Sequence, residues 1–211
     1  MKLVIDKNKH GFETKEFREY LKTPCLKTEI TQQEADELRM NLKNALIEYG
    51  GLGISATQLG IKKRACLIVL GDEELFLVNP QIVEKSKDGF LFAEGCLSIP
   101  KTIQKPVTTI RAAMVKVQTD NLGELVFQIN PEEDKKVGGV SIDTMKTVVV
   151  QHEIDHLDGL TIRDRVYSTT VVKQTSYGRN EKVVMKSPQG EMVEVKGKHA
   201  NKYFLQGYEI V

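Results

Sequence analysis

The sequence predicts an α+β fold in which antiparallel β-sheets surround one central helix. Three observations indicate this class. Apolar residues recur at helical spacing over 31–49, β-rich runs fill much of 65–129, and a second helical repeat over 141–159 carries two histidines. Strands that follow one another between two helices, without a regular strand–helix alternation, are typical of α+β proteins.

Length and composition indicate a soluble globular protein with one medium domain, with or without a small appendage. The 211 residues are 40% hydrophobic and 28% charged, which is ordinary. The formal net charge of +1 gives no reason to expect direct nucleic-acid or membrane binding. The start of the chain lacks a signal-peptide core, and the three scattered cysteines fit a reducing compartment. We therefore expect a cytoplasmic protein.

The first helix is predicted to begin at Thr31. Thr31 and Glu34 have the spacing of a capping box, in which each residue satisfies a backbone N–H of the other. Apolar residues then recur at helical spacing as far as Tyr49, and the pair Gly50-Gly51 ends the helix.

Strands are predicted for the runs 65–70, 75–83 and 109–119, which are rich in β-branched and other apolar residues. The last run is joined by "DNLG" (120–123) to "ELVFQI" (124–129). A short connection containing Asn and Gly between two such runs predicts a β-hairpin.

The segment "SIDTMKTVVVQHEIDHLDG" (141–159) returns to helical spacing. Three consecutive valines would favour a strand. In a strand, however, the two histidines would lie too far apart to meet one ion, so we predict a helix that ends at Gly159. One face of this helix would then carry Met145, Val148, Val149, His152 and His156.

Within this helix, His152 and His156 lie one above the other and can offer nitrogen atoms to a single metal ion. Glu153 follows the first histidine, and a carboxylate on that flank can accept a proton from an activated water without binding the metal. This is the chemistry of an H-E-x-x-H motif. Two histidines with a purely structural role are the alternative, which Glu153 makes less favoured.

A catalytic site of this kind needs a third protein ligand. One known pattern would place a histidine at Ile162, which cannot bind a metal. Another takes a glutamate from a later helix, and Glu181 qualifies only by its distance along the chain, because its surroundings have no helical character. A third source is Cys96 in "FAEGCLSIP" (92–100), although an isolated cysteine can equally be a small buried hydrophobic residue.

Three motifs together resemble the signature motifs of the peptide deformylases, in the order of that family. They are "GLGISATQLG" (51–60), "EGCLSIP" (94–100) and "QHEIDHLDG" (151–159). The resemblance covers most of the chain to about residue 167. It implies a metal-dependent hydrolase that removes the N-formyl group from the initiator methionine of nascent polypeptides and releases formate.

The resemblance also implies which residues form the metal centre. Cys96, His152 and His156 would bind the metal, and Glu153 would act as the general acid/base. The implied ion is Fe²⁺, for which Zn²⁺, Ni²⁺ or Co²⁺ can substitute; the ligand types alone do not select among these ions.

Substrate contacts follow from the same resemblance. Gln58 and the backbone N–H of Leu97 are expected to donate hydrogen bonds to the oxyanion. Glycines in the first motif would let a peptide add as an extra strand, and apolar residues of the central helix would receive the methionine side chain. The expected substrate-binding residues are Leu52, Gly53, Met145, Val148 and Val149.

Departures from the family pattern concern two places. Members of the family commonly have alanine where Ser55 stands, so the added hydroxyl needs a partner. The link after Pro100 is lengthened and lacks the substrate-contacting arginine often found there. Alignment on "VKV" (115–117) places Arg111 beside Glu94, and we expect this pair to support the site as a bidentate ion pair.

The expected organisation is a catalytic domain over 1–167, a linker over 168–180 and a small hairpin extension over 181–211. The extension has no residue that matches the site, and docking to the ribosome is one use that we consider for it. Two rival functions remain: a non-catalytic metal or peptide-binding module, and a zinc endoprotease. The first would need neither Glu153 nor Gln58, and the second lacks its third ligand.

Overall fold

The computed structural model describes residues 2–7, 11, 13–167, 182–187, 190–196 and 209–210. The chain divides into two compact units, Met1–Tyr167 and Ser168–Val211. The linker predicted over 168–180 and the candidate Glu181 lie outside the described residues. No helix in the described part of the chain is long and apolar enough to cross a membrane.

The predicted first helix is α2 (Gln32–Tyr49), and it is confirmed together with its cap. Thr31 Oγ1 accepts from the backbone N–H of Glu34 at 3.3 Å, and Glu34 Oε2 accepts from the N–H of Thr31 at 2.9 Å. The helix ends at Gly50, whose φ of 75° is unfavourable for other residues. Its apolar face packs on strands β1 and β2.

Eight strands of the first unit form three sheets, and every pairing is antiparallel. The sheets are β1 (Gly53–Ser55), β2 (Ala65–Leu70) and β3 (Glu73–Val78); β4 (Gln81–Lys85), β7 (Met114–Thr119) and β8 (Gly123–Gln128); and β5 (Gly89–Glu94) with β6 (Val107–Ala112). The hairpin predicted around 120–123 is confirmed, because β7 and β8 pair from Thr119 and Gly123 onward.

The run 75–83 was predicted as one strand, and this prediction is wrong. The chain leaves β3 at Val78 and enters β4, in another sheet, at Gln81. Between them Asn79 adopts a φ of 48°, and its amide donates hydrogen bonds to the Thr28 carbonyl and to Asp120, both at 2.8 Å. These side-chain bonds stabilise a turn, for which the dipeptide Asn79-Pro80 was the signal in the sequence.

The run 109–119 is also two strands. β6 ends at Ala112 and pairs with β5, whereas β7 begins at Met114 and pairs with β4 and β8. Ala113 lies between them, and its N–H donates to the carbonyl of Asp88 at 3.0 Å. Four consecutive apolar residues, 112–115, span the change of sheet, so no polar or turn residue marks it in the sequence.

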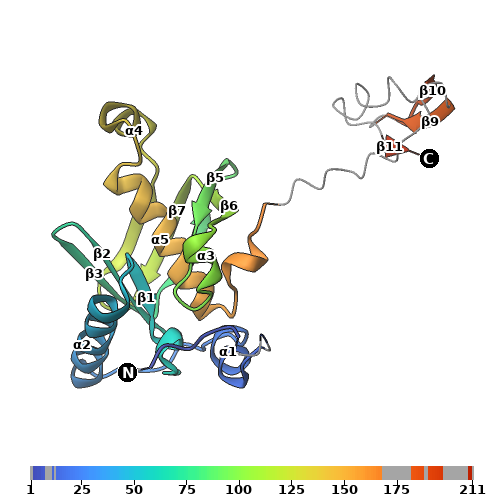
Figure 1. The fold of residues 1–211 in the computed structure, drawn as a ribbon. Coiled ribbons are helices and arrows are strands. Elements are labelled where there is room, and N and C mark those ends of the chain that lie inside the picture. The colour runs from blue at the N-terminus through green and yellow to red at the C-terminus, as the bar shows by residue number, and fades with distance from the viewer. Residues whose placement is uncertain are drawn as a thin grey trace. The chain divides into compact units, whose positions relative to one another are not determined.

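The central helix is α5 (Ile142–Leu157), which confirms the predicted α+β class. Ser141 caps its first turn, and Gly159 follows its last turn with a φ of 74°, as predicted. Every residue from Thr147 to Leu157 is buried, because α5 packs on β1, β2, β7 and β8. Figure 1 shows α5 in the middle of the first unit, with β1–β3 to one side and β5–β6 to the other.

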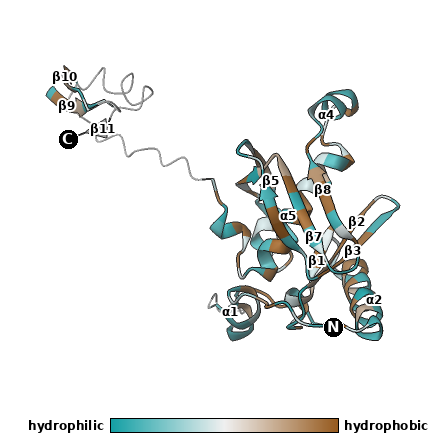
Figure 2. Cartoon of the chain, turned by 180° about the vertical axis from the view of Figure 1, so that it is seen from behind, coloured by the Kyte–Doolittle hydropathy of each residue, from teal (hydrophilic) through white to brown (hydrophobic). Residues whose placement is uncertain are grey.

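Hydropathy separates this helix from the surface helices. Figure 2 shows hydrophobic colouring along α5 and the strands beside it, whereas α4 is largely hydrophilic.

The predictions did not include α1 (Lys15–Leu21), α3 (Lys101–Gln104) and α4 (Pro131–Val137). These helices have four to seven residues and few or no buried side chains, so they carry little apolar repeat. Short 3₁₀ turns, η1 (Ala56–Leu59) and η2 (Ile162–Asp164), complete the first unit.

The second unit contains the predicted hairpin. β9 (Lys182–Lys186) pairs with β10 (Met192–Lys196), and β11 (Glu209–Ile210) adds to the other edge of β9. Val183 and Met185 are buried, while their neighbours along β9 are exposed. This alternation is that of a strand with one covered face.

Candidate active site

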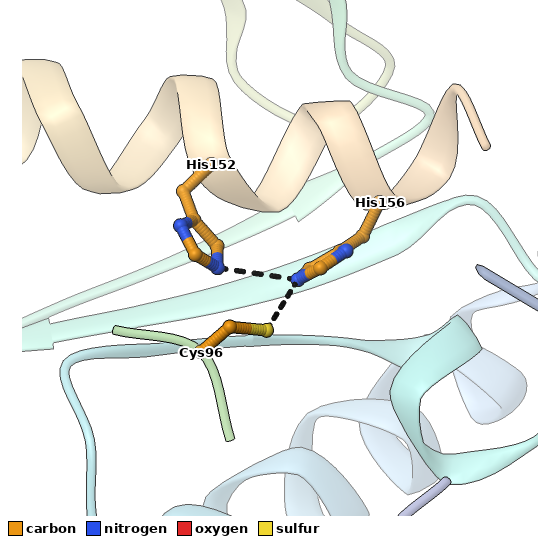
Figure 3. Close-up of side chains that lie close together, drawn as sticks. All are labelled: Cys96, His152 and His156. Carbon is orange, nitrogen blue, oxygen red and sulfur yellow. Dashed lines mark hydrogen bonds between the residues drawn. The ribbon is translucent and has the colours of Figure 1, made fainter. Parts of the chain in front are cut away.

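Three side chains from two distant parts of the chain bring metal-binding atoms together. Cys96 Sγ lies 3.3 Å from His156 Nε2, which in turn lies 3.2 Å from His152 Nε2 (Figure 3). All three ligand atoms lie within 4.8 Å of one another. Two nitrogen atoms that bind one tetrahedral ion at 2.0–2.1 Å are about 3.3 Å apart. The donor set therefore fits a single metal ion.

The helix α5 and the turn after β5 position these three ligand atoms. His152 and His156 project from consecutive turns of α5, and Cys96 lies in a tight turn directly after β5. The Ile99 N–H donates to the Cys96 carbonyl at 2.9 Å, and the Cys96 N–H donates to Thr102 Oγ1 at 2.9 Å. Ile162, where one pattern would have required a histidine, is part of a hydrophobic cluster.

The other two cysteines have a different environment. Burial raises the pKa of the Cys25 thiol and raises that of the Cys66 thiol well above its usual value. A thiol of raised pKa is a poor metal ligand at neutral pH, since the thiolate is the binding form. Of the three cysteines, Cys96 is the one that faces two imidazoles.

Glu94 holds the first histidine in place. Its Oε2 lies 2.7 Å from His152 Nδ1, which leaves Nε2 free for a metal. Arg111 donates from Nε to Glu94 Oε1 at 2.6 Å and from Nη2 to Oε2 at 2.8 Å, so the predicted bidentate pair is present and buried. Burial opposes a charge on Glu94, but the bonds from His152 and Arg111 outweigh it and lower the pKa of Glu94 to about 2.

The ion-pair chain continues to residues that were not predicted. Arg111 Nη1 donates to Asp155 Oδ2 at 2.5 Å, and Arg165 donates from Nη2 to Asp155 Oδ1 at 2.8 Å. Asp155 is buried and lies between the two histidines on α5. The signal that could have found it is a carboxylate on a helix predicted to be central, because such a group needs a cationic partner.

Glu153 is a buried carboxylate with one uncommitted oxygen. It is 3% exposed, and its Oε2 has no hydrogen-bond partner in the described part of the chain. β1 passes close by: a Cβ on Gly53 would lie 2.7 Å from Glu153 Oε1 and 2.6 Å from Val149 Cγ1. Burial raises the pKa of Glu153 to about 7, although His152 and Arg111 oppose the rise.

Gln58 has a fixed orientation. Its Oε1 accepts from the Ser55 N–H at 2.9 Å, and its Nε2 lies 3.2 Å from Ser98 Oγ and 4.0 Å from Cys96 Sγ. The Ser55 hydroxyl finds its partners here, 3.1 Å from Thr57 Oγ1 and 3.3 Å from Gln58 Oε1. The amide NH₂ therefore points toward the metal-binding cysteine.

A cavity of about 320 Å³ opens onto these groups. Glu153, Gln58, Leu97, Cys96 and His152 line it, so the residues predicted for chemistry share one space with two of the three predicted ligands. The predicted substrate-binding residues line the same cavity: Leu52, Gly53, Met145, Val148 and Val149. It also contains residues that were not predicted, namely Phe92, Ala93, Thr102, Ile103 and Pro106.

A cysteine sulfur and two imidazoles that can hold one ion, beside a carboxylate oxygen without a partner among the described residues, define the chemistry of a metal-dependent hydrolase on an α+β fold. More particularly, the chain belongs to the polypeptide deformylase family, whose sequence profile matches residues 15–171. It is therefore an enzyme that removes N-formyl groups from polypeptides.

Individual relatives with similar sequences or structures are also peptide deformylases. The chain is 34% identical over 146 residues to the peptide deformylase of Natranaerobius thermophilus, a match that covers 69% of this chain and 85% of the relative. It is 33% identical to peptide deformylase 1 of Bacillus subtilis, with 70% and 84% covered. An actinonin-bound class I type b peptide deformylase from Acinetobacter baumannii has a TM-score of 0.58 at 27% identity, over 79% of this chain and 99% of that structure.

Proposed function

We propose that this chain deformylates the initiator methionine of nascent polypeptides with a metal held by Cys96, His152 and His156. Glu153 is the general acid/base. The observation that carries the proposal is the position of Glu153, whose Oε2 has no hydrogen-bond partner among the described residues and whose side chain lines one cavity with Cys96 and His152.

The metal is Fe²⁺ in this proposal, with Zn²⁺, Ni²⁺ or Co²⁺ able to substitute. When bound, the ion supplies Lewis-acid polarisation of the formyl carbonyl and lowers the pKa of the attacking water. A thiolate with two imidazoles suits several of these ions, so the choice of Fe²⁺ rests on family membership. Glu94 supports the site by fixing the tautomer of His152, and Arg111 supports Glu94 in turn.

The proton is moved by Glu153. Its carboxylate accepts a proton from the attacking water and then delivers it to the leaving amine. Both transfers need an oxygen that is not committed to a structural hydrogen bond, and Oε2 meets that condition among the described residues.

The charge that develops on the formyl oxygen is stabilised by Gln58 Nε2 and the N–H of Leu97. The Gln58 amide is held by the backbone N–H of Ser55 before any substrate arrives, so it needs no reorientation during the reaction. The Ser55 hydroxyl, 3.3 Å from Gln58 Oε1, adds a second bond that an alanine side chain would lack.

The methionine side chain occupies the apolar wall that α5 presents to the cavity. Met145, Val148 and Val149 form this wall with Leu52 of the segment before β1. The peptide backbone adds as a strand beside Gly53, where the missing side chain allows a close approach. A structure of the Acinetobacter baumannii enzyme, 27% identical and with a TM-score of 0.58, carries Met-Ala-Ser, a peptide of the product class expected here.

The organisation of the whole chain follows as a proposal. Residues 1–167 form the catalytic domain, 168–180 a linker and 181–211 an extension that is dispensable for chemistry. Nascent chains are the partners, in the cytoplasm, and the ribosome is a docking partner considered for the extension. Direct binding to nucleic acids or membranes is not expected, because the net charge is only +1.

Formate release tests the proposal. The full chain, loaded anaerobically with Fe²⁺ or Ni²⁺, should release formate from formyl-Met-Ala-Ser and no acetate from acetyl-Met-Ala-Ser. A metal-loaded sample that binds the peptide but releases no formate would support the non-catalytic module instead. Cleavage of internal peptide bonds without formate would support an endoprotease.

A further inference from the structure

The lengthened link after Pro100 folds as α3 and places Ile103 at the active-site cavity. Ile103 lines the cavity with Pro106 and with Phe92 of β5, yet the residue is 54% exposed. Half of an apolar side chain is thus available at the one cavity where substrate is proposed to bind. Exposed apolar side chains that gather at one cavity commonly mark a binding site.

α3 is held firmly, although it is only one turn long. Thr102 Oγ1 accepts from the Cys96 N–H at 2.9 Å and donates to the Ile99 carbonyl at 2.7 Å. Gly95 allows the close contact: a Cβ there would lie 3.0 Å from the Thr102 carbonyl oxygen and 3.1 Å from Ile103 Cδ1. The position of Ile103 is therefore coupled to the turn that carries Cys96.

The cavity has room beyond the methionine side chain. Its volume of about 320 Å³ lies in the range of sites for drug-sized ligands. The wall from α5 is assigned to methionine, and the surface formed by Ile103, Pro106 and Phe92 comes from other elements. A second peptide side chain can contact that surface.

The charged residues at the cavity indicate which type of peptide side chain it can accept. Among the described residues that line the cavity, no lysine or arginine occurs. The carboxylate of Glu94 is committed to Arg111 and His152, and Glu153 is buried. An acidic side chain would find no cation among the residues that line the cavity, since Lys101 and Lys105, on either side of Ile103, are exposed and do not line it. An aliphatic side chain would be stabilised there, because its contact with Ile103 removes apolar surface from water.

We propose that Ile103 is a specificity-determining residue, which favours formyl-Met peptides with an aliphatic side chain after methionine and disfavours acidic ones. This inference rests on the proposed function, because it assumes that the methionine side chain of the substrate contacts the apolar residues of α5 that line the cavity. The lack of an arginine in the link after Pro100 would then change which peptides the enzyme prefers, and would not merely remove one contact to the substrate.

The test compares peptides within each enzyme. Formyl-Met-X-Ser and formyl-Met-Ala-X, with X as Leu, Ala or Glu, are assayed with metal-loaded full chain by formate release. For at least one position, Ile103→Ala should reduce the Leu/Ala ratio of kcat/KM by about three- to tenfold. This is at or below the low end of the roughly 10–200-fold that one methylene contributes in an apolar pocket, because Ile103 is half exposed. Ile103→Arg should raise the Glu/Ala ratio, because a cation would then meet the carboxylate.

Ile110→Ala is the matched control, since Ile110 on β6 is 51% exposed and does not line this cavity. Ratios taken within one variant cancel differences in folding and metal loading. Equal Leu/Ala ratios in the wild type and Ile103→Ala at both positions would overturn the inference, as would an equal effect of Ile110→Ala. If no peptide releases formate, the proposed function fails by itself, and the relative binding of Met-Leu-Ser and Met-Ala-Ser by calorimetry then decides on Ile103.

Discussion

At the scale of single residues, a substitution of Glu153 should affect catalysis without affecting metal binding. Glu153→Gln should retain the metal, because the three ligands are untouched, and should lower kcat by about 10²–10⁴-fold, the usual contribution of a general acid/base. Metal content by elemental analysis and formate release in the same sample measure the two effects.

Cys96→Ser provides the contrast to Glu153→Gln. It replaces one of three ligands and should weaken metal retention itself during dialysis. Full activity in metal-loaded Glu153→Gln would remove Glu153 from the mechanism. Metal retention by Cys96→Ser equal to that of the wild type would remove the cysteine from the ligand set.

Single residues also show where sequence reasoning succeeds. Cys96, His152 and His156 could be predicted because they lie in short motifs, and the structure brings their ligand atoms together. The sequence could indicate that Asp155 needs a cationic partner, but not that Arg111 supplies it, because that contact joins elements distant along the chain. The bond from Cys96 to Thr102 spans only six positions and depends on the shape of the turn between them.

At the scale of elements, the contact of β1 with α5 depends on Gly53. Gly53→Ala places a methyl group 2.6 Å from Val149 Cγ1 and 2.7 Å from Glu153 Oε1, so strand and helix must separate. We expect the free energy of unfolding to fall by about 1–3 kcal/mol, and turnover to fall with it. Gly139→Ala is the control, because a Cβ there meets nothing within 4 Å. Urea titration of both variants tests the comparison.

The turn η2 is joined to the segment after α1 by a charged contact. Lys22 Nζ lies 2.6 Å from Asp164 Oδ2, which also accepts from the Thr161 N–H at 2.8 Å. Burial alone would raise the pKa of Asp164, but the bonds from Lys22 and Thr161 lower it below its usual value. Because the folded state favours the ionised form, its stabilisation is present above the unfolded-state pKa and is lost as pH falls through the folded-state pKa.

Asp164→Asn should therefore destabilise the protein at pH 7 and less so in acid. The contact is partly exposed, so we expect a loss of at most about 1 kcal/mol at pH 7. The difference from the wild type should narrow as pH falls below about 4, where the unfolded chain begins to bind the proton. Urea unfolding at pH 7, 5 and 3.5 measures it. A difference that is independent of pH would show that the charge of Asp164 is not its source.

Elements were predicted well where one helix carries its own cap and repeat, as α2 does, and poorly where strands change sheet. β3 with β4 were read as one run because the turn signal of Asn79-Pro80 was passed over, and β6 with β7 because the apolar residues run on without a break from Ala112 to Val115. The partners of Asn79 and Ala113, which are Asp120 and Asp88, lie elsewhere in the chain. Tertiary contacts, which local periodicity does not report, decide such breaks.

At the scale of the whole molecule, the two compact units predict a simple truncation result. A chain that ends after residue 175 keeps the whole first unit, Met1–Tyr167, and the residues matched by the family profile. Its kcat/KM on formyl-Met-Ala-Ser should stay within about twofold of the full chain, because a compact unit with its own core can fold alone. A folded, metal-loaded truncation without turnover would place the extension in the active site.

The separation of Cys96 from His156 by 60 positions has a consequence for the order of synthesis. The chain is made from its N-terminus, so Cys96 leaves the ribosome well before α5 exists. In the finished enzyme this thiol is 2% exposed, but until α5 docks it stays open to oxidation, which would destroy a ligand. The speed of α5 docking thus sets how long the nascent enzyme is vulnerable. Pulsed alkylation during refolding should show Cys96 becoming protected only when α5 is in place.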